Sequence, residues 1–397
     1  MKQDNKALPA QATARTIAPI SLTMWSRAVV IAGLIVALLL PFIVKNFLIF
    51  QLTLALIYAV AILGLNLLTG FNGQFSLGHS AFYGIGAYMA AILMDRADVA
   101  YYLTPPAAGA VCFIVGFLFG LPASRLQGIY LALATFSLAV AMPQLLKLTP
   151  LEPWTGGVQG IVIIKPDAPF GLPLNADQWL YYFTILVSAV MYSCAVNLVR
   201  SRTGRAIMAI RDNPIAASAM GIDVALYKSL TFGVSALYTG VAGALGAIAV
   251  QFVAPDSFTF NLAIAMFVGL VIGGVGSIPG TLFAGLFVLF VPNVAEQVSK
   301  GLAQAVYGII LIVVIYVMPS GGVGFVRMIG NRIARVCEAL TELGHVPRIW
   351  SRRDKVEEST NQLSRGVSYI DIKRLTRPLR PKVHPPPPTS GAASPDA

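Results

Sequence analysis

The chain has 397 residues, of which 56% are hydrophobic and only 11% are charged, and its mean hydropathy is +0.74. Because soluble domains carry about 25% charged residues, this composition excludes a string of soluble domains and indicates a membrane protein. Most of the formal net charge of +11 lies outside the apolar runs, as orientation in a bilayer requires. This distribution favours a membrane surface over nucleic acid as the reason for the charge.

The N-terminal segment, residues 1–27, is polar and mildly basic, and an apolar run over residues 28–44 follows it. A signal peptide is the competing interpretation of this run. However, no small-residue cleavage site follows the run, and another apolar run begins almost at once. We therefore expect residues 28–44 to form the first transmembrane helix and residues 1–27 to be cytoplasmic.

Further spans are expected wherever about 20 apolar residues occur together, which is the helix length that crosses ~30 Å of hydrocarbon. About ten such helices fill a transmembrane domain over residues 28–318. The predicted fold class is therefore an all-α polytopic membrane protein. The spans expected after the first are residues 47–69, 77–94, 105–121, 127–146, 179–199, 229–250, 260–275, 280–298 and 302–318.

The orientation of this domain follows from its basic residues. With the N-terminus in the cytoplasm, ten crossings place Arg125, the loop 200–228 and the C-terminal tail inside. Leaving the tail aside, the inside holds ten basic residues, namely four in residues 1–27, Arg125 and five in the loop, and the outside holds five. Because this excess agrees with the positive-inside rule, both termini are expected in the cytoplasm.

A glycine-rich stretch with many polar residues occupies residues 64–93. Unsatisfied polar groups in hydrocarbon cost several kcal/mol each, so this stretch must face protein or water. Its glycines favour helix breaks along a solute path, as in transporters with discontinuous helices. The alternative is that small residues let helices pack closely. The candidate path residues are Asn66, Thr69, Gly70, Gly73, Gln74, Ser76, Gly78, His79 and Ser80.

Two roles remain open for His79 in this stretch, a hydrogen-bonded packing residue or a substrate ligand. Ionisable residues are scarce in the spans, so a solute on this path would be recognised by backbone amides and by polar side chains. The side chains expected to take part are Asn66, Gln74, Ser76 and Ser80.

The segment 148–178 is rich in proline and glycine and carries Trp154, and Trp179 follows it. The expected topology places this segment outside the membrane. It is interpreted either as a plain connector with interfacial tryptophans or as a docking surface for an external partner.

The loop 200–228 is the only long charged interruption in the second half of the chain. Asn213 is a good helix cap, and Pro214 suits the first helical position. Gly221 suits a left-handed helix end. The pattern predicts a short helix, residues 214–220, whose apolar face fits a groove on a soluble partner. That face comprises Ile215, Ala216, Ala219 and Met220.

A possible internal repeat relates the glycine-rich stretch to a later junction between spans. Gln74-Phe75-x-x-x-His79-Ser80 and Gln251-Phe252-x-x-x-Asp256-Ser257 share a spacing. Five crossings separate the two junctions, so they are expected on opposite sides of the membrane. This is the arrangement that an inverted repeat of five plus five helices produces.

The C-terminal tail, residues 319–397, begins with a basic amphipathic piece and ends in a proline-rich run. The first part is suited to lie along anionic membrane lipid. The second part cannot form a packed core, and we expect it to be disordered.

Several kinds of chemistry have no motif in this sequence. It contains no G-x-x-x-x-G-K-[ST] loop for ATP, no H-E-x-x-H, no Cys/His cluster for a metal and no G-x-S-x-G. No nucleophile and base are placed together, so an enzyme is not supported. Ionisable residues within the spans are nearly limited to His79 and Glu296, whereas ion-coupled transporters place such groups in the membrane.

Four segments in order along the chain carry a family resemblance. They are LNLLTGFNGQFSLGHSAFYGIGAY, GIYLALATFSLA, SRTGRAIMAIRDNPIAASAMGIDVALYK and GGVGSIPGTLFAG. With them the chain resembles the integral-membrane permeases of branched-chain amino acid ABC importers, in particular the member of the usual pair with the longer N-terminus. The tail 319–397 departs from the family's core, so its role is open.

The resemblance implies that the loop 200–228 contacts an ATPase subunit and that its short helix is a cytoplasmic coupling helix. The alternative is that its charges only enforce orientation. The residues that match the family's loop pattern are Gly204, Arg205, Arg211, Asp212, Asn213, Gly221 and Lys228, and Pro214 begins the coupling helix.

The resemblance further implies a permease of the bacterial inner membrane that works by alternating access. Its expected partners are a second permease subunit, two ATP-binding subunits and a periplasmic substrate-binding protein. No cofactor is expected on this chain, because ATP would be bound by the partner. The cargo alternatives are urea, short amides and aromatic acids, and an ion-coupled secondary transporter is the alternative from another class.

Overall fold

A computed structural model describes most of the membrane domain. All of the described residues belong to the first of two compact units, Met1–Gly330. The expected segments 1–27 and almost all of 319–397 lie outside the described residues, as does most of the expected first span. The described residues are 37–126, 128–168, 174–298, 302–317, 321, 322 and 324.

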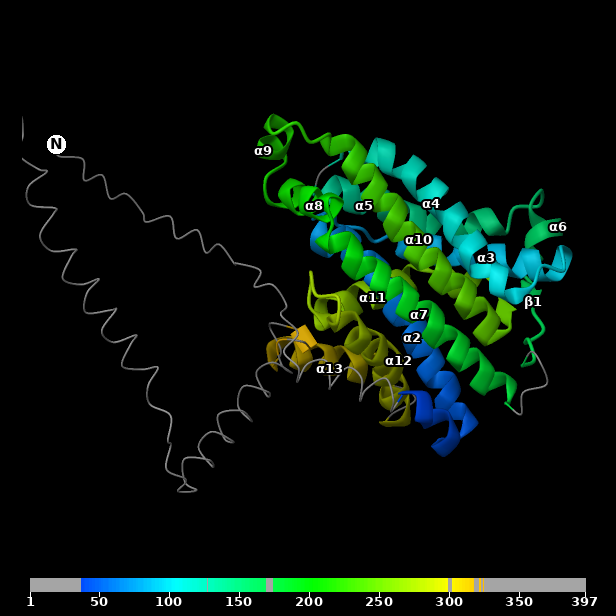
Figure 1. Ribbon diagram of the computed structural model, residues 1–397. Helices are drawn as coiled ribbons and strands as arrows, with labels where there is room; N and C mark the ends of the chain where they lie inside the picture. Colours follow the sequence, from blue (N-terminus) through cyan, green and yellow to red (C-terminus); the bar gives the residue numbers. More distant parts are fainter. Residues whose placement is uncertain are drawn as a thin grey trace, which may run out of the picture. The chain divides into compact units, whose positions relative to one another are not determined.

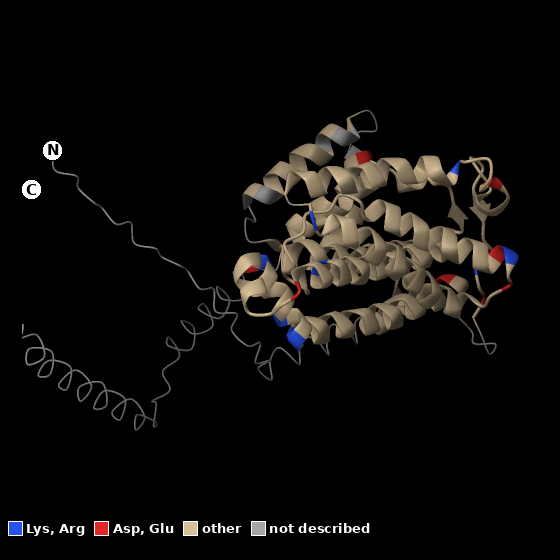
Figure 2. Cartoon of the chain, turned by 90° about the horizontal axis from the view of Figure 1, so that it is seen from above, with Lys and Arg blue, Asp and Glu red and all other residues tan. Residues whose placement is uncertain are grey.

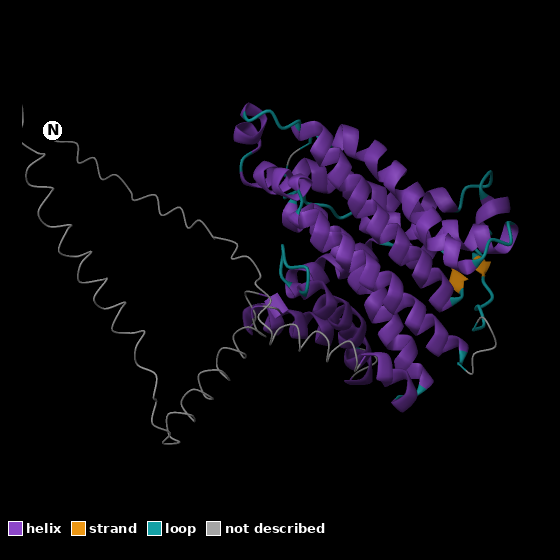
Figure 3. Ribbon diagram, viewed as in Figure 1, coloured by secondary structure: helices purple, strands orange, loops and turns teal. Residues whose placement is uncertain are grey.

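Helices make up almost all of this structure (Figures 1 and 3). The short ones are η2 Tyr101–Leu103, α6 Glu152–Thr155, α8 Arg202–Asp212, α9 Pro214–Ala219 and η4 Pro255–Phe258. The long ones are α2 Asn46–Asn66, which continues as the π-helical turn η1 Leu67–Phe71, α3 His79–Arg96, α4 Thr104–Ala123, α5 Ile129–Leu146, α7 Ala176–Arg200, α10 Val224–Val250, α11 Phe260–Gly273, α12 Gly280–Val298 and α13 Ala303–Val317.

Seven helical segments among the described residues are long and apolar enough to cross a membrane. The predicted all-α polytopic membrane fold is therefore confirmed. The seven segments lie where spans are expected from the sequence. They are Asn46–Phe71, Tyr101–Ala123, Ile129–Leu146, Ala176–Arg200, Val224–Val250, Pro255–Gly273 and Gly280–Gln297.

The count of ten spans stays a prediction. Two further helices, α3 and α13, lie where spans are expected, but they are not among the seven segments. The remaining expected span, residues 28–44, is described only from residue 37 onward.

The central helix is α10, which packs against α2, α3 and α4 and is buried along most of its length. Its glycines allow this, because small residues let helix backbones approach closely within a membrane. A Cβ atom at Gly240 would lie 2.4 Å from Cys112 Sγ, and one at Gly243 would lie 2.1 Å from the Tyr83 carbonyl oxygen. Charged residues lie mainly near the ends of the helices (Figure 2).

One end of the bundle carries a short antiparallel pair of strands. Strand β1, Ile161–Val162, pairs with β2, Phe252–Val253. Beside this pair, Lys147 Nζ lies 2.6 Å from Asp256 Oδ1. The segment 148–178 is thus hydrogen-bonded through β1 to the residues that follow α10. The proline and glycine content of the segment did not predict this pairing. Trp154 in this segment is exposed.

The two junctions of the possible repeat lie at opposite ends of α10. Gln74, in the first junction, donates a hydrogen bond to Lys228 near the start of α10, and the second junction follows the end of α10 at Val250. A helix of 27 residues is about 40 Å long. This placement agrees with an inverted repeat of five plus five helices, which stays a prediction.

Candidate functional site

The short helix α9, Pro214–Ala219, begins where its sequence predicts and ends one residue earlier than predicted, with Met220 as its C-cap. The Asn213 side-chain oxygen accepts hydrogen bonds from the backbone N–H groups of Ile215 and Ala216 at 3.0 and 3.1 Å. Pro214 is the first helical residue, and Gly221 leaves the helix with φ of +82°. The prediction of a short capped helix is therefore confirmed, whereas its coupling role stays a prediction.

The apolar face of α9 is exposed in this chain. Ile215 and Met220 are 82% and 83% exposed, and Ala217 is the only buried residue of α9. Ala216 and Ala219 are exposed beside them. Burial of apolar surface is favourable by about 25 cal/mol per Å², so this face would gain free energy from a partner that covers it.

A second helix, α8, precedes α9 and was not predicted from the sequence, in which residues 200–212 look like charged flanks of the short helix. The Ser201 hydroxyl caps α8 by accepting from the Gly204 N–H at 3.2 Å, and Ile207 and Ile210 are buried. The signal was present, because a capping serine followed by apolar residues three apart is typical of an amphipathic helix.

The helix α8 packs on η1, α7 and α10. A small apolar pocket lies between these elements. Its lining comes from η1, the end of α7, α8 and α10, and consists of Leu67, Phe71, Leu198, Val199, Gly204, Ile207 and Thr231.

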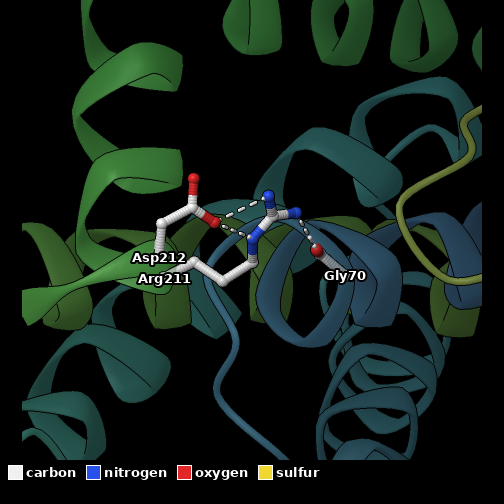
Figure 4. Close-up of polar contacts among 3 residues, drawn as sticks. All are labelled: Gly70, Arg211 and Asp212. Carbon is white, nitrogen blue, oxygen red and sulfur yellow. Dashed lines mark hydrogen bonds and ion pairs between the residues drawn. The ribbon is translucent and has the colours of Figure 1, made fainter. Parts of the chain in front are cut away.

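The charged residues of this segment have different surroundings. The Arg205 Nη1 atom donates to the Arg200 carbonyl oxygen at 3.3 Å on the exposed side of α8. The Arg211 Nη1 atom instead donates to the Gly70 carbonyl oxygen at 3.1 Å, and Arg211 also pairs with Asp212 (Figure 4). Lys228 lies within α10 rather than in a loop, because α10 begins at Val224. The expected loop boundary is corrected accordingly.

The candidate path residues surround the break between α2 and α3. The Asn66 side chain is fully buried and bridges the α11–α12 turn, with Nδ2 donating to the Ser277 carbonyl at 2.9 Å and Oδ1 accepting from the Gly276 N–H at 2.8 Å. Thr69 Oγ1 donates to the Gln74 carbonyl at 3.0 Å. Asn66 therefore ties the end of α2 to the α11–α12 turn, whereas Thr69 stabilises the break internally.

Two glycines of this break are required by close contacts. A Cβ atom at Gly70 would lie 2.5 Å from the Gly276 nitrogen. Gly73 has φ of +73°, and a Cβ atom there would lie 2.8 Å from Arg211 Cγ. Close packing therefore accounts for both residues, and their place along a solute path stays a prediction.

A chain of hydrogen bonds begins at Ser76 and runs through His79. The Ser76 hydroxyl lies 3.1 Å from His79 Nδ1, and His79 Nε2 lies 2.6 Å from the Ser235 hydroxyl. The Ser235 hydroxyl donates to the Gly64 carbonyl at 2.6 Å. His79 is only 1% exposed, so these contacts are those of a hydrogen-bonded packing histidine, one of the two roles left open.

Other polar groups near the break lack partners among the described residues. The Ser80 hydroxyl and both polar atoms of the Asn72 side chain are buried without a hydrogen bond. Gly78 packs against Thr135, whose hydroxyl accepts from the Leu77 N–H at 3.0 Å. Of the side chains expected to bind a solute, Asn66, Gln74 and Ser76 have hydrogen-bond partners, whereas Ser80 has none among the described residues.

Comparison with known proteins gives permease components of branched-chain amino acid transport systems. A family model for the permease component of branched-chain amino acid transport systems matches residues 47–315. The high-affinity branched-chain amino acid transport system permease protein LivM of Escherichia coli K12 is 29% identical over 75% of this chain and 75% of its own length. LivM of Salmonella typhimurium is 32% identical over 64% of this chain and 65% of its own length.

A second kind of permease protein from such systems is also similar. LivH of Salmonella typhimurium is 27% identical over 68% of this chain and 92% of its own length. No solved structure matches the chain significantly. The family model covers more than half of the chain and the relatives agree with it, so the chain belongs to the family of permease components of branched-chain amino acid transport systems.

Proposed function

We propose that this chain is the permease subunit of an ABC importer in a bacterial inner membrane, driven by ATP that a separate subunit hydrolyses. The cargo is a branched-chain amino acid, by similarity to LivM and LivH, whose names refer to transport of these solutes. The absence of a phosphate-binding loop from the whole sequence supports a division of labour, because ATP then has to be bound by another chain.

The exposed apolar face of α9 is the observation that carries this proposal. Ile215 and Met220 project from a helix that is capped at Asn213 and ends at Gly221. A rigid helix with an uncovered apolar face loses little entropy when it enters a groove. The ATP-binding subunit supplies that groove.

The remaining assembly is proposed on similar grounds. The LivM and LivH names describe two permease proteins of such transport systems, which supports a pair made of this chain and a second permease. Two ATP-binding subunits sit at the α8–α9 end, which is cytoplasmic because basic residues gather there. A periplasmic substrate-binding protein delivers the cargo to the β1–β2 end.

Transport proceeds by alternating access in this proposal. ATP closes the dimer of ATP-binding subunits, and their movement displaces α9. The displacement passes through α8 to the break between α2 and α3, where the path residues lie. A solute is then held by polar side chains and backbone groups, because the spans carry almost no ionisable residues.

The test changes the exposed face of α9 in the assembled transporter. The variants Ile215→Glu and Met220→Glu are expected to reduce the amount of ATP-binding subunit that co-purifies with the permease, because a charge enters an apolar interface. Ile164→Glu is the matched control, since Ile164 is 88% exposed at the other end of the bundle. Undiminished capture by both α9 variants contradicts the proposal.

The cargo is tested separately by uptake into vesicles that contain the cognate binding protein. Leucine, isoleucine and valine are compared with urea, short amides and aromatic acids. Uptake that persists without the ATP-binding subunit and follows a proton or sodium gradient would instead identify a secondary transporter.

A further inference from the structure

The guanidinium of Arg211 joins the α8–α9 segment to the broken end of α2. Its Nη1 atom donates to the Gly70 carbonyl oxygen at 3.1 Å across 141 positions of sequence. Its Nε and Nη2 atoms both donate to Asp212 Oδ1, at 3.0 and 2.9 Å (Figure 4). Asp212 therefore holds the guanidinium in the orientation that reaches Gly70.

The acceptor is a backbone group that its own helix leaves free. Gly70 lies in the last turn of α2 and η1, where carbonyl groups have no partner farther along the helix. A hydrogen bond from a charged donor is stronger than one between neutral groups. The Arg211 side chain of α8 thus supplies the donor that the Gly70 carbonyl lacks within its own helix.

The contact is also steric. Gly73 has no room for a side chain while Arg211 is present, because a Cβ atom there would lie 2.8 Å from Arg211 Cγ. On another side of the same turn, a Cβ atom at Gly70 would lie 2.5 Å from the Gly276 nitrogen. The turn η1 and the residues that follow it are therefore in close contact with both Arg211 and the α11–α12 turn, so a movement of α8 would act on them directly.

The turn between these two contacts has an uncommon geometry. η1 is π-helical over Leu67–Phe71, and π-helical turns are rare and occur frequently at functional sites. Because its hydrogen bonds span one residue more than those of an α-helix, conversion of the turn to α-helix shifts the next residues by one position. Those residues lead directly to the buried groups at Ser76 and His79.

We propose that Arg211 is a positioning residue that transmits movement of α8 and α9 to the end of α2 through Gly70. This inference rests on the proposed function, because it assumes that an ATP-binding subunit moves α9. It assigns Arg211 a role inside the permease rather than in the docking surface, where the family resemblance had placed it.

The first test measures two quantities separately: the amount of ATP-binding subunit that co-purifies with the permease, and the solute uptake per ATP hydrolysed. Arg211→Gln is expected to leave capture within about twofold of wild type while solute uptake per ATP falls about ten- to a hundredfold, the range of one charge-assisted hydrogen bond. Arg211→Lys keeps a donor and is expected to recover part of this loss. Arg202→Gln removes an exposed arginine of the same helix and is expected to change neither quantity.

The second test replaces the contact with a covalent bond. A Cβ atom at Gly73 would lie 3.6 Å from Arg211 Cβ, within the range of about 3.5–4.5 Å found in disulfides. The Gly73→Cys, Arg211→Cys double variant is made with the three native cysteines replaced by serine. The reduced double variant is expected to show low solute uptake per ATP. Oxidation, which forms the disulfide, is expected to raise this ratio toward the wild-type value. Because the comparison uses one folded sample in two states, a general folding defect cannot produce this result.

The outcomes distinguish the inference from the proposed function. Equal uptake per ATP in Arg211→Gln and Arg202→Gln, or in the oxidised and reduced double variant, overturns the inference alone. Loss of capture in Arg211→Gln makes Arg211 a docking residue and also overturns it. Failure of the wild-type permease to capture any ATP-binding subunit overturns the proposed function itself.

Discussion

Gln74 and Lys228 are joined by a hydrogen bond in which the Gln74 side-chain Nε2 donates to the Lys228 carbonyl oxygen at 3.1 Å. Gln74 lies in the break between α2 and α3, and Lys228 lies in the first turns of α10. The bond therefore connects the candidate path to the helix at the centre of the bundle. Like the bond from Arg211 to Gly70, it connects this break to residues 200–228.

Substitution of Gln74 is expected to weaken this connection. Gln74→Leu removes a buried donor and its bond, a loss of about 1 kcal/mol in the free energy of unfolding. Thermal unfolding of the purified protein measures the loss. Gln159→Leu is the control, because Gln159 is exposed, and equal unfolding temperatures for the two variants would contradict the prediction.

Asn66 is expected to matter more for stability. Asn66→Ala leaves the Gly276 N–H and the Ser277 carbonyl without their partner, and each lost bond that strands a buried group costs about 1–3 kcal/mol. We expect a loss of about 2–5 kcal/mol, measured by thermal unfolding. Asn197→Ala at an exposed position of α7 is expected to stay within about 0.5 kcal/mol of wild type.

The roles left open for His79 make different kinetic predictions. Both ring nitrogens already have hydroxyl partners, so His79→Leu is expected to lower stability by about 1–3 kcal/mol and to leave the KM for uptake unchanged in the folded fraction. Thermal unfolding and initial uptake rates measure the two effects. A large rise in KM with unchanged stability would instead identify His79 as a substrate ligand.

The cap of α9 is expected to control its order. Asn213→Ala removes both side-chain bonds to the first turn, at a cost of about 0.5–2 kcal/mol. In the proposed assembly this variant captures less ATP-binding subunit. Asn213→Asp retains a capping oxygen and is expected to restore capture, whereas equal capture by the Ala and Asp variants would show that the cap is irrelevant to docking.

The sequence alone determined the features that depend on neighbouring residues. Long apolar runs predict membrane helices, because each must satisfy its own backbone groups in hydrocarbon. The bounds of α9 follow from Asn213, Pro214 and Gly221, whose effects act within one turn. The four segments that resemble the family are also local patterns, and the family that they indicate is the one that the comparisons found.

Only the tertiary structure decided which distant residues meet. Arg211 could have faced a partner protein as easily as Gly70, 141 positions away, and Asn66 lies 210 positions from Gly276. The helix α8 was missed because its charged face dominates the composition while Ile207 and Ile210 are buried on the other. Such contacts arise from the packing of whole helices around α10, and no short segment contains the information that sets them.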